Sequence, residues 1–362
     1  MENCISVTVK NQSGLTMYLA VQYGDKDLWL SIADINALAW QPFNKDTCVK
    51  KIDKGTFDTP TTFDWNLIQY CNQQEEKVRM YVANMPLTGE SFDPMATTFL
   101  YDIVEMGWNT TWNITNVDFF CFPMQLEGNN EKVGYKDKLT RADIFNDLAQ
   151  MPEPFRNLFV IEMLDDEELA IILRYLSPSL YINAPFSDEL NSCFQEAITT
   201  GMPLLANYDG NFTYGDYTLS NFRITAENDI IVDIKTKSTN VEATYTLSNI
   251  NTIGVAGNII ISSPDDSAGK TAAVLIAAAV ERGVLYNPEL WGQSGGSNQG
   301  LPKDYYQNNL SNCNQYNYYA KVLHDNSFCG LSYTFPYDDI FLQAPKIQFN
   351  EGDHAIITIM PF

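Results

Sequence analysis

Short runs in which hydrophobic and polar positions alternate occupy the first third of the sequence and predict β-strands. β-branched and aromatic residues fill these runs, and Gly, Asn, Asp and Pro residues separate them. This spacing is typical of a β-sandwich or a β-barrel. The predicted strands are 6–9, 17–23, 77–82, 99–106 and 115–122.

A helical period replaces the alternation near residue 135 and predicts a mixed α/β region. Helices are expected at 139–150, 159–176, 267–284 and 303–324, and Ser187 followed by two acids predicts an N-cap of a helix that reaches about residue 199. Strands are expected at 217–224, 230–235, 242–247 and 257–261, and a last β-segment ends with 355–359. We interpret this order as a β domain of residues 1–135 and 326–362 that carries an inserted mixed α/β domain of residues 136–325.

The charge balance narrows the classes of partner. The 362 residues include 22 Lys and Arg against 45 Asp and Glu, which gives a net charge of −23. Such a chain lacks the basic surface that nucleic acids and anionic membranes require. The longest apolar run, residues 271–280, is far shorter than the roughly 20 residues of a membrane span. The first residues do not read as a signal peptide, so we expect an intracellular or inclusion-associated protein, or a secreted protein without its leader.

Few residues are available for metal or nucleotide chemistry. The seven cysteines are odd in number and lack C-x-x-C spacing, and there are only two histidines. We therefore expect no metal site and no dense disulfide framework. Residues 268–271, Ala-Gly-Lys-Thr, resemble the end of a phosphate-binding loop, but Pro264 stands where the first glycine belongs. Helix capping is the interpretation we prefer there.

The richest chemistry lies in residues 99–123, where two strand-like runs flank a turn of Asn, Thr and Trp residues. A hairpin centred between Thr111 and Trp112 would set Glu105 directly opposite Asp118. Like charges directly opposite each other destabilise a sheet, so this arrangement calls for an explanation, and two interpretations are open. The pair is either two solvated acids on an exposed face, or the general acid and general base of a glycoside hydrolase, which needs two carboxyls in different protonation states.

Two groups of motifs favour the second reading. Residues 101–105, Tyr-Asp-Ile-Val-Glu, precede 116–119, Asn-Val-Asp-Phe, and a Phe-Pro pair. Far downstream, 318–324 read Tyr-Tyr-Ala-Lys-Val-Leu-His and 332–339 read Ser-Tyr-Thr-Phe-Pro-Tyr-Asp-Asp. In this order the motifs resemble those of glycoside hydrolase family 64, the endo-β-1,3-glucanases of the thaumatin-like superfamily, and weaker similarity covers most of the chain.

The resemblance implies a fold, a substrate and a site. It implies a thaumatin-like β-barrel or sandwich domain and a mixed α/β domain with a wide groove between them, and β-1,3-glucan oligosaccharide or polysaccharide as substrate. It also implies an inverting mechanism without a cofactor, with Glu105 as general acid and Asp118 as general base. The expected substrate-binding residues are Tyr101, Trp108, Trp112, Tyr337, Asp338 and Asp339.

Alternatives remain for several of these residues. Trp108 and Trp112 either stack on glucose rings or cover the barrel end, and Asp338 and Asp339 either bind sugar hydroxyls or hydrogen-bond within their own loop. Asp102 points to the opposite strand face from Glu105, which favours a structural role.

The sequence departs from the family pattern in ways that keep other functions open. The interval from Glu105 to Asp118 is about three residues shorter than usual, Tyr101 replaces a Trp, and Val104 replaces a Cys. The alternative function is a non-catalytic thaumatin-like protein that binds glucan or self-associates into an intracellular inclusion, and a toxin on the same fold is a third. A fold alone does not decide between them.

Overall fold

A computed structural model describes most of the chain. The described residues are 4–23, 28–31, 40–68, 78–88, 93–106, 111–163, 170–181, 187–248, 260–263, 266–292, 302–307, 316–336, 338, 345–350 and 352–362. The described residues form four β-sheets built from 21 strands, together with six α-helices. The molecule is therefore mainly β, as predicted, and none of its described helices is long and apolar enough to cross a membrane.

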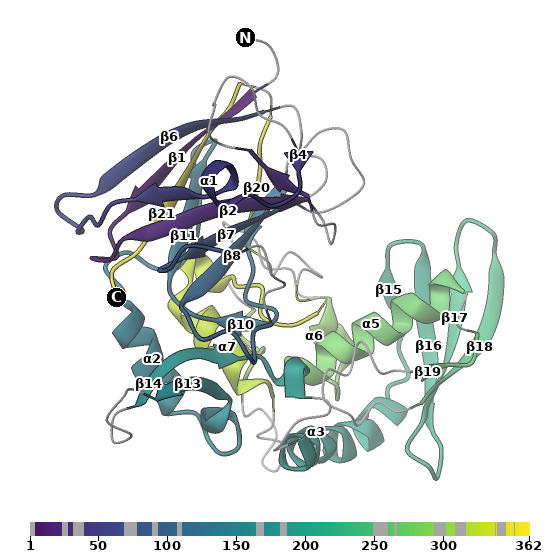
Figure 1. Ribbon diagram of the computed structural model, residues 1–362. Helices are drawn as coiled ribbons and strands as arrows, with labels where there is room; N and C mark the ends of the chain where they lie inside the picture. Colours follow the sequence, from purple (N-terminus) through teal and green to yellow (C-terminus); the bar gives the residue numbers. More distant parts are fainter. Residues whose placement is uncertain are drawn as a thin grey trace.

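Strands from both ends of the sequence build a five-stranded sheet. Its order is β12 (Glu131–Gly134), β11 (Met124–Gly128), β21 (His354–Ile359), β1 (Cys4–Asn11) and β6 (Thr61–Ile68). The late strand β21 lies between β11 and β1 and runs parallel to β1 (Figure 1). Alternate residues of β1, Ile5, Val7 and Val9, are buried on one face, so the alternation in the sequence reports a half-buried strand.

An eight-stranded sheet packs against the five-stranded one and carries the Tyr-Asp-Ile-Val-Glu motif of residues 101–105. Its path is β20 (Lys346–Gln348), β9 (Thr111–Ile114), β8 (Tyr101–Met106), β7 (Val78–Ala83), β2 (Met17–Tyr23), β3 (Trp29–Leu30) and β4 (Trp40–Gln41), with β5 (Lys50–Ile52) beside β2. The short helix α1 (Lys45–Cys48) precedes β5, and Asn44 caps it. β11 and β12 contact β9 and β20 across the two sheets. Among the described strands neither sheet closes on itself, so the arrangement is a sandwich and the barrel alternative is not observed.

A small third sheet corrects one predicted helix. Its order is β10 (Phe119–Phe120), β14 (Ala170–Leu176) and β13 (Phe159–Met163). The helix expected at 159–176 is therefore wrong, because this segment pairs with itself and with β10. The β-branched residues of both runs suit strands, and the pairing of β14 with Phe119 and Phe120 is too far apart in the sequence for any local pattern to predict.

Two helices flank this third sheet. The predicted helix at 139–150 is observed as α2 (Arg141–Ala149), which begins with a capping box between Thr140 and Asp143. α7 (Tyr318–Asn326) contacts α2, and Asn317 caps it. The helix expected at 303–324 is thus shorter than predicted, since residues 303–306 form a turn and 308–315 lie outside the described residues. Single 3-10 turns occur at Phe155–Asn157, Pro178–Tyr181 and Phe328–Gly330.

The fourth sheet stands at one side of the molecule next to α3 and α5 (Figure 1). It is an antiparallel array of β15 (Phe212–Tyr214), β16 (Tyr217–Ile224), β17 (Ile230–Thr236), β18 (Val241–Ser248) and β19 (Ile260–Ile261). Its helices are α3 (Ser187–Ala206), α5 (Ser267–Glu281) and α6 (Pro288–Trp291). The Asp266 carboxylate accepts from the Ala268 amide at the start of α5, which is the helix cap expected in place of a phosphate loop.

Candidate active site

Strand register fixes the surroundings of Glu105. On one side β8 sets Glu105 opposite Arg79 of β7, and on the other side opposite Asn113 of β9. The expected pairing of Glu105 with Asp118 is therefore wrong. The residue opposite Glu105 is Asn113, five positions before the one that the sequence pattern suggested, and Asp118 follows the end of β9 rather than facing β8.

A bend between β9 and β10 carries Asp118, whose residue is exposed. The buried Asn116 holds this bend: its amide N–H donates to the Tyr333 carbonyl at 2.7 Å, and its side-chain Nδ2 donates to the Phe119 carbonyl at 3.3 Å. The Tyr319 hydroxyl of α7 donates to the Asn116 carbonyl at 2.8 Å. The Asn-Val-Asp-Phe motif is thus a bend anchored by elements that are distant in the sequence.

Both acids line one pocket of about 300 Å³, at the small end of the range for ligand sites. Its lining residues are Arg79, Tyr81, Pro94, Tyr101, Ile103, Glu105, Thr115, Val117, Asp118, Phe119 and Tyr333. Thr115 also forms a bridge with Tyr333, which brings the second group of motifs to the same wall. The structure thus brings Glu105 and Asp118 together by a route that the predicted hairpin did not describe.

The two carboxyls have unlike environments. The Glu105 side chain is only 8% exposed, and its Oε1 lies 3.7 Å from Arg79 Nε. Asp118 is exposed, and its backbone carbonyl accepts from the Ser177 amide at 2.8 Å. Two carboxyls with different surroundings can divide the roles of acid and base.

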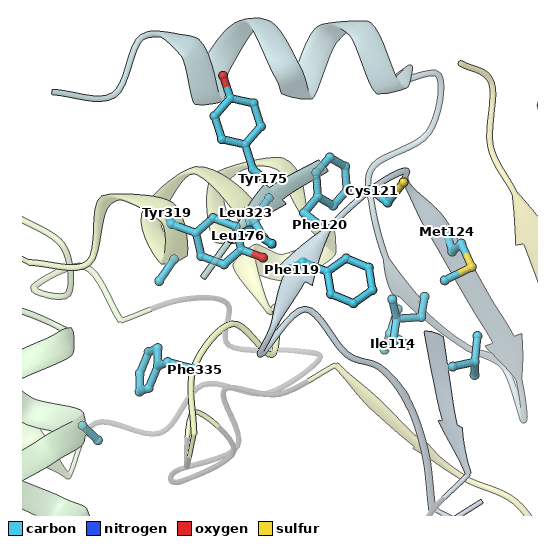
Figure 2. Packing of buried hydrophobic residues seen from close by; sticks show 14 of the residues in the cluster. Ile114, Phe119, Phe120, Cys121, Met124, Tyr175, Leu176, Tyr319, Leu323 and Phe335 are labelled. Atoms are coloured by element: carbon cyan, nitrogen blue, oxygen red, sulfur yellow. The ribbon is translucent and has the colours of Figure 1, made fainter. Parts of the chain in front are cut away.

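Buried aromatic rings form the back of the pocket. The Tyr101 ring packs on Phe119 with centroids 4.8 Å apart, and both residues are almost fully buried. Burial raises the pKa of the Tyr101 hydroxyl above its usual value, so the hydroxyl remains protonated. Figure 2 shows Phe119 and Phe120 leaving β10 toward different parts of the core, with Tyr175 and Tyr319 nearby. Tyr101, one of the expected substrate-binding residues, is thus part of the pocket lining, although none of its surface is exposed to solvent.

Arg174 of β14 braces these walls from behind. Its guanidinium is buried, donates to the carbonyls of Pro94 and Phe99, and lies 4.8 Å from the Tyr101 ring and 5.7 Å from the Phe119 ring. Pro94, Tyr101 and Phe119 all line the pocket. One buried cation thus holds three parts of its wall.

Asp102 lies on the opposite face of β8 and is fully buried, as expected for a structural residue. Its carboxylate accepts from the backbone N–H groups of Ile103 at 2.8 Å, Cys121 at 3.0 Å and Phe122 at 3.3 Å. Burial raises the pKa of Asp102 to about 7, and these bonds and Arg174 limit the rise. Asp102 therefore ties the strand that bears Glu105 to the segment that follows Asp118.

Trp112 and Asp338, two of the predicted substrate-binding residues, are buried and do not line the pocket. Trp112 of β9 is 0% exposed and packs on Phe349 with centroids 5.0 Å apart, so it cannot stack on a glucose ring. Asp338 is also 0% exposed. Trp112 instead fills the interface between the sheets, because a residue next to Asn113 in the strand must face the other side. Trp108, Tyr337 and Asp339 lie outside the described residues.

Asp338 organises the loop that carries Tyr333. Its carboxylate accepts from Thr334 Oγ1 at 2.8 Å, His324 Nε2 at 2.9 Å and Arg282 Nη2 at 3.2 Å. Burial would raise the pKa of Asp338, but His324 and Arg282 hold it below the usual value. Asp338 of the Phe-Pro-Tyr-Asp-Asp motif thus lies behind the pocket wall and holds the loop that carries Tyr333 in place.

Sequence reasoning missed several lining residues, above all Arg79, Tyr81 and Tyr333. A signal for the first two was present. In the predicted strand at 77–82, Arg79 and Tyr81 alternate with apolar neighbours, and a basic residue inside such a strand indicates a polar face. Tyr333 lies within the motif at 332–339, but its place at the pocket involves a non-local bridge to Thr115, which no local pattern predicts. No cluster of three or more His, Cys, Asp or Glu side chains suited to a metal occurs within the described ranges.

A family model described as beta-1,3-glucanase, that of glycoside hydrolase family 64, matches residues 66–359. The chain belongs to this family. It is therefore a member of a family of glycoside hydrolases, and the family 64 match spans every residue of the pocket. No curated protein sequence matches the chain.

Solved structures support the same fold for this family 64 chain. A beta-1,3-glucanase domain (GH64) from Clostridium beijerinckii is 20% identical, with a TM-score of 0.64 over 99% of this chain and 98% of that one. A laminaripentaose-producing beta-1,3-glucanase in complex with laminaritetraose is 16% identical, with a TM-score of 0.65 over 99% of each chain. A third, from Paenibacillus barengoltzii and complexed with laminarihexaose, is 19% identical, with a TM-score of 0.56 over 99% of this chain and 75% of that one.

Proposed function

We propose that this protein is an inverting endo-β-1,3-glucanase in which Glu105 is the general acid and Asp118 the general base. The observation that carries the proposal is that both acids, from separate segments, line one pocket in a chain of family 64. The neighbours that hold laminaritetraose and laminarihexaose support a β-1,3-linked glucose chain as substrate.

The chemistry assigns one proton transfer to each acid. Glu105 donates its proton to the glycosidic oxygen as that bond breaks, and Asp118 removes a proton from the water that attacks the opposite face of the sugar. The buried position of Glu105 suits an acid that must be shielded from bulk water, and the exposed position of Asp118 suits a base that a solvent molecule must reach.

The fold supports a finer architectural proposal as well. We propose a thaumatin-like sandwich built from residues 1–135 and 326–362, and a mixed α/β domain of 136–325 that forms the opposite wall of a substrate groove. The pairing of β21 with both β1 and β11 supports the assignment of the two terminal segments to one domain.

Release of reducing sugar from a linear β-1,3-glucan tests the function. We expect activity in the wild type and a loss of about 10²–10⁴-fold in Glu105→Gln and in Asp118→Asn. NMR of the first product should show the α-anomer, because inversion converts the β-linkage. Loss of less than about tenfold in Glu105→Gln would contradict its role. A folded wild type that binds laminarihexaose without cleaving it would favour the non-catalytic alternative.

A further inference from the structure

Polar side chains follow one line across the eight-stranded sheet and pass through Glu105. Strand register sets Gln22 opposite Arg79, Arg79 opposite Glu105, Glu105 opposite Asn113, and Asn113 opposite Lys346. Directly paired residues share a face of a sheet. With strands about 4.8 Å apart, the line is about 19 Å long. Glu105 is therefore one position in a polar row rather than an isolated acid.

Arg79 is the neighbour in this row that reaches the pocket. It lines the pocket with Glu105 and Asp118, and it is the only cationic side chain among the described residues that do so. Its side chain is 30% exposed, against 8% for Glu105. Tyr81, two residues along β7, lines the same pocket, and its hydroxyl donates to Gln22 Oε1 at 2.9 Å.

The hydrogen-bonding chemistry of the Arg79 guanidinium suits the binding of a sugar. A guanidinium carries five N–H donors in one plane, which suits planar recognition of oxygen acceptors. Glucose hydroxyls accept hydrogen bonds, and a charged donor strengthens them. A side chain that contacts the acid and is partly exposed in the same pocket can thus hold a ring beside the bond to be broken.

We propose that Arg79 is a substrate-binding residue whose guanidinium donates hydrogen bonds to the hydroxyls of the glucose ring that lies against Glu105. This inference rests on the proposed function, because it takes the ligand to be a β-1,3-linked glucose chain. It adds a cation on β7 to the two acids and extends the binding surface from Glu105 toward Gln22.

Calorimetric binding of laminarihexaose tests the proposal without relying on catalysis. In the Glu105→Gln background, Arg79→Met should weaken binding by about tenfold to a hundredfold, since hydrogen bonds to charged groups are lost. Arg79→Lys keeps the charge but loses the planar fork, so we expect a smaller loss. Circular dichroism establishes that each variant is folded, and the Lys variant carries the test if the Met variant is not.

The matched control is Arg223→Met in the same background. Arg223 also pairs with a carboxylate across a sheet, since its Nη2 lies 2.6 Å from Asp233 Oδ1, but it belongs to β16 and does not line the pocket. Its loss should leave the affinity unchanged. Equal affinities in Arg79→Met and the control would overturn the inference. No binding by the Glu105→Gln protein would overturn the proposed substrate as well, whereas Arg79-dependent binding by an inactive wild type would overturn only the hydrolytic function.

Discussion

Replacing Arg174 by Met tests whether the pocket depends on a buried cation behind its wall. The substitution keeps most of the alkyl packing and removes the donors to the Pro94 and Phe99 carbonyls. Hydrogen bonds from a charged donor are worth about 1.5–3 kcal/mol each, and the stacking on Tyr101 adds about 1 kcal/mol. Both carbonyl residues are half-buried, so water recovers part of the loss, and removal of a buried charge recovers more. We expect the free energy of unfolding to fall by about 3 kcal/mol.

The effect on catalysis should exceed the effect expected from stability alone. Pro94, Tyr101 and Phe119 lose a common support, and small displacements in a site can reduce the rate by up to about a hundredfold. Urea unfolding gives the stability, and kcat/KM on laminarihexaose is measured where each variant remains fully folded. Arg174→Lys should restore part of kcat/KM, because the charge near Tyr101 is kept.

Arg141→Met is the control for this experiment. Arg141 also donates to backbone carbonyls, those of Cys121, Ile172 and Leu173, and its guanidinium lies 3.8 Å from the Phe145 ring. None of these groups lines the pocket. We expect a comparable loss of stability with little change in kcat/KM. If Arg174→Met loses no more kcat/KM than Arg141→Met, Arg174 serves the fold alone and the reasoning is refuted.

Three further predictions concern buried groups. Burial raises the pKa of Glu281 to about 8 from 4.5, so its contribution to stability is full below about pH 4.5 and is lost as the pH rises to about 8. Glu281→Gln should flatten the fall in unfolding free energy between pH 5 and 8 by about 4 kcal/mol, and an unchanged slope would contradict this. Trp112→Ala should cost about 3–5 kcal/mol of stability and leave the affinity for laminarihexaose unchanged. Weaker binding by a variant that remains folded would instead support stacking of Trp112 on a glucose ring. Asp338→Asn should cost about 3–5 kcal/mol in urea unfolding, because the buried Arg282 loses its ion pair with the Asp338 carboxylate, and wild-type stability would show that this ion pair contributes nothing.

Local signals predicted the parts of the fold that local forces determine. The alternation at 217–224, 230–235 and 242–247 is observed almost to the residue as β16, β17 and β18, because one face of each strand is buried against helices. The helix predicted at 139–150 is observed as α2, because its capping box is formed within four consecutive residues, from Thr140 to Asp143.

Non-local pairing accounts for the errors. The run at 159–176 has apolar residues at helical spacing, yet Leu176 pairs with Phe119 and the segment forms strands. The predicted partner of Glu105 was wrong for a related reason. Asn113 lies opposite Glu105, and Asp118 lies in the segment after β9, which leaves the sheet and bonds to Tyr333 through the Asn116 amide. The hairpin spacing and the family motifs both predicted that the two acids lie close together. They do line one pocket, but through a bend at Asp118 that no local pattern specifies.

The position of β21 has a consequence for biosynthesis. Ser6 and His354 are hydrogen-bonded neighbours that lie 348 residues apart in the chain. Until residues 354–359 have been synthesised, any β1 or β11 strand that forms lacks β21 as its pairing partner. Open edges of this kind promote aggregation. A chain that stalls before residue 354 therefore exposes unpaired strands on the ribosome, and chaperones that cover such edges should bind the nascent protein until β21 emerges.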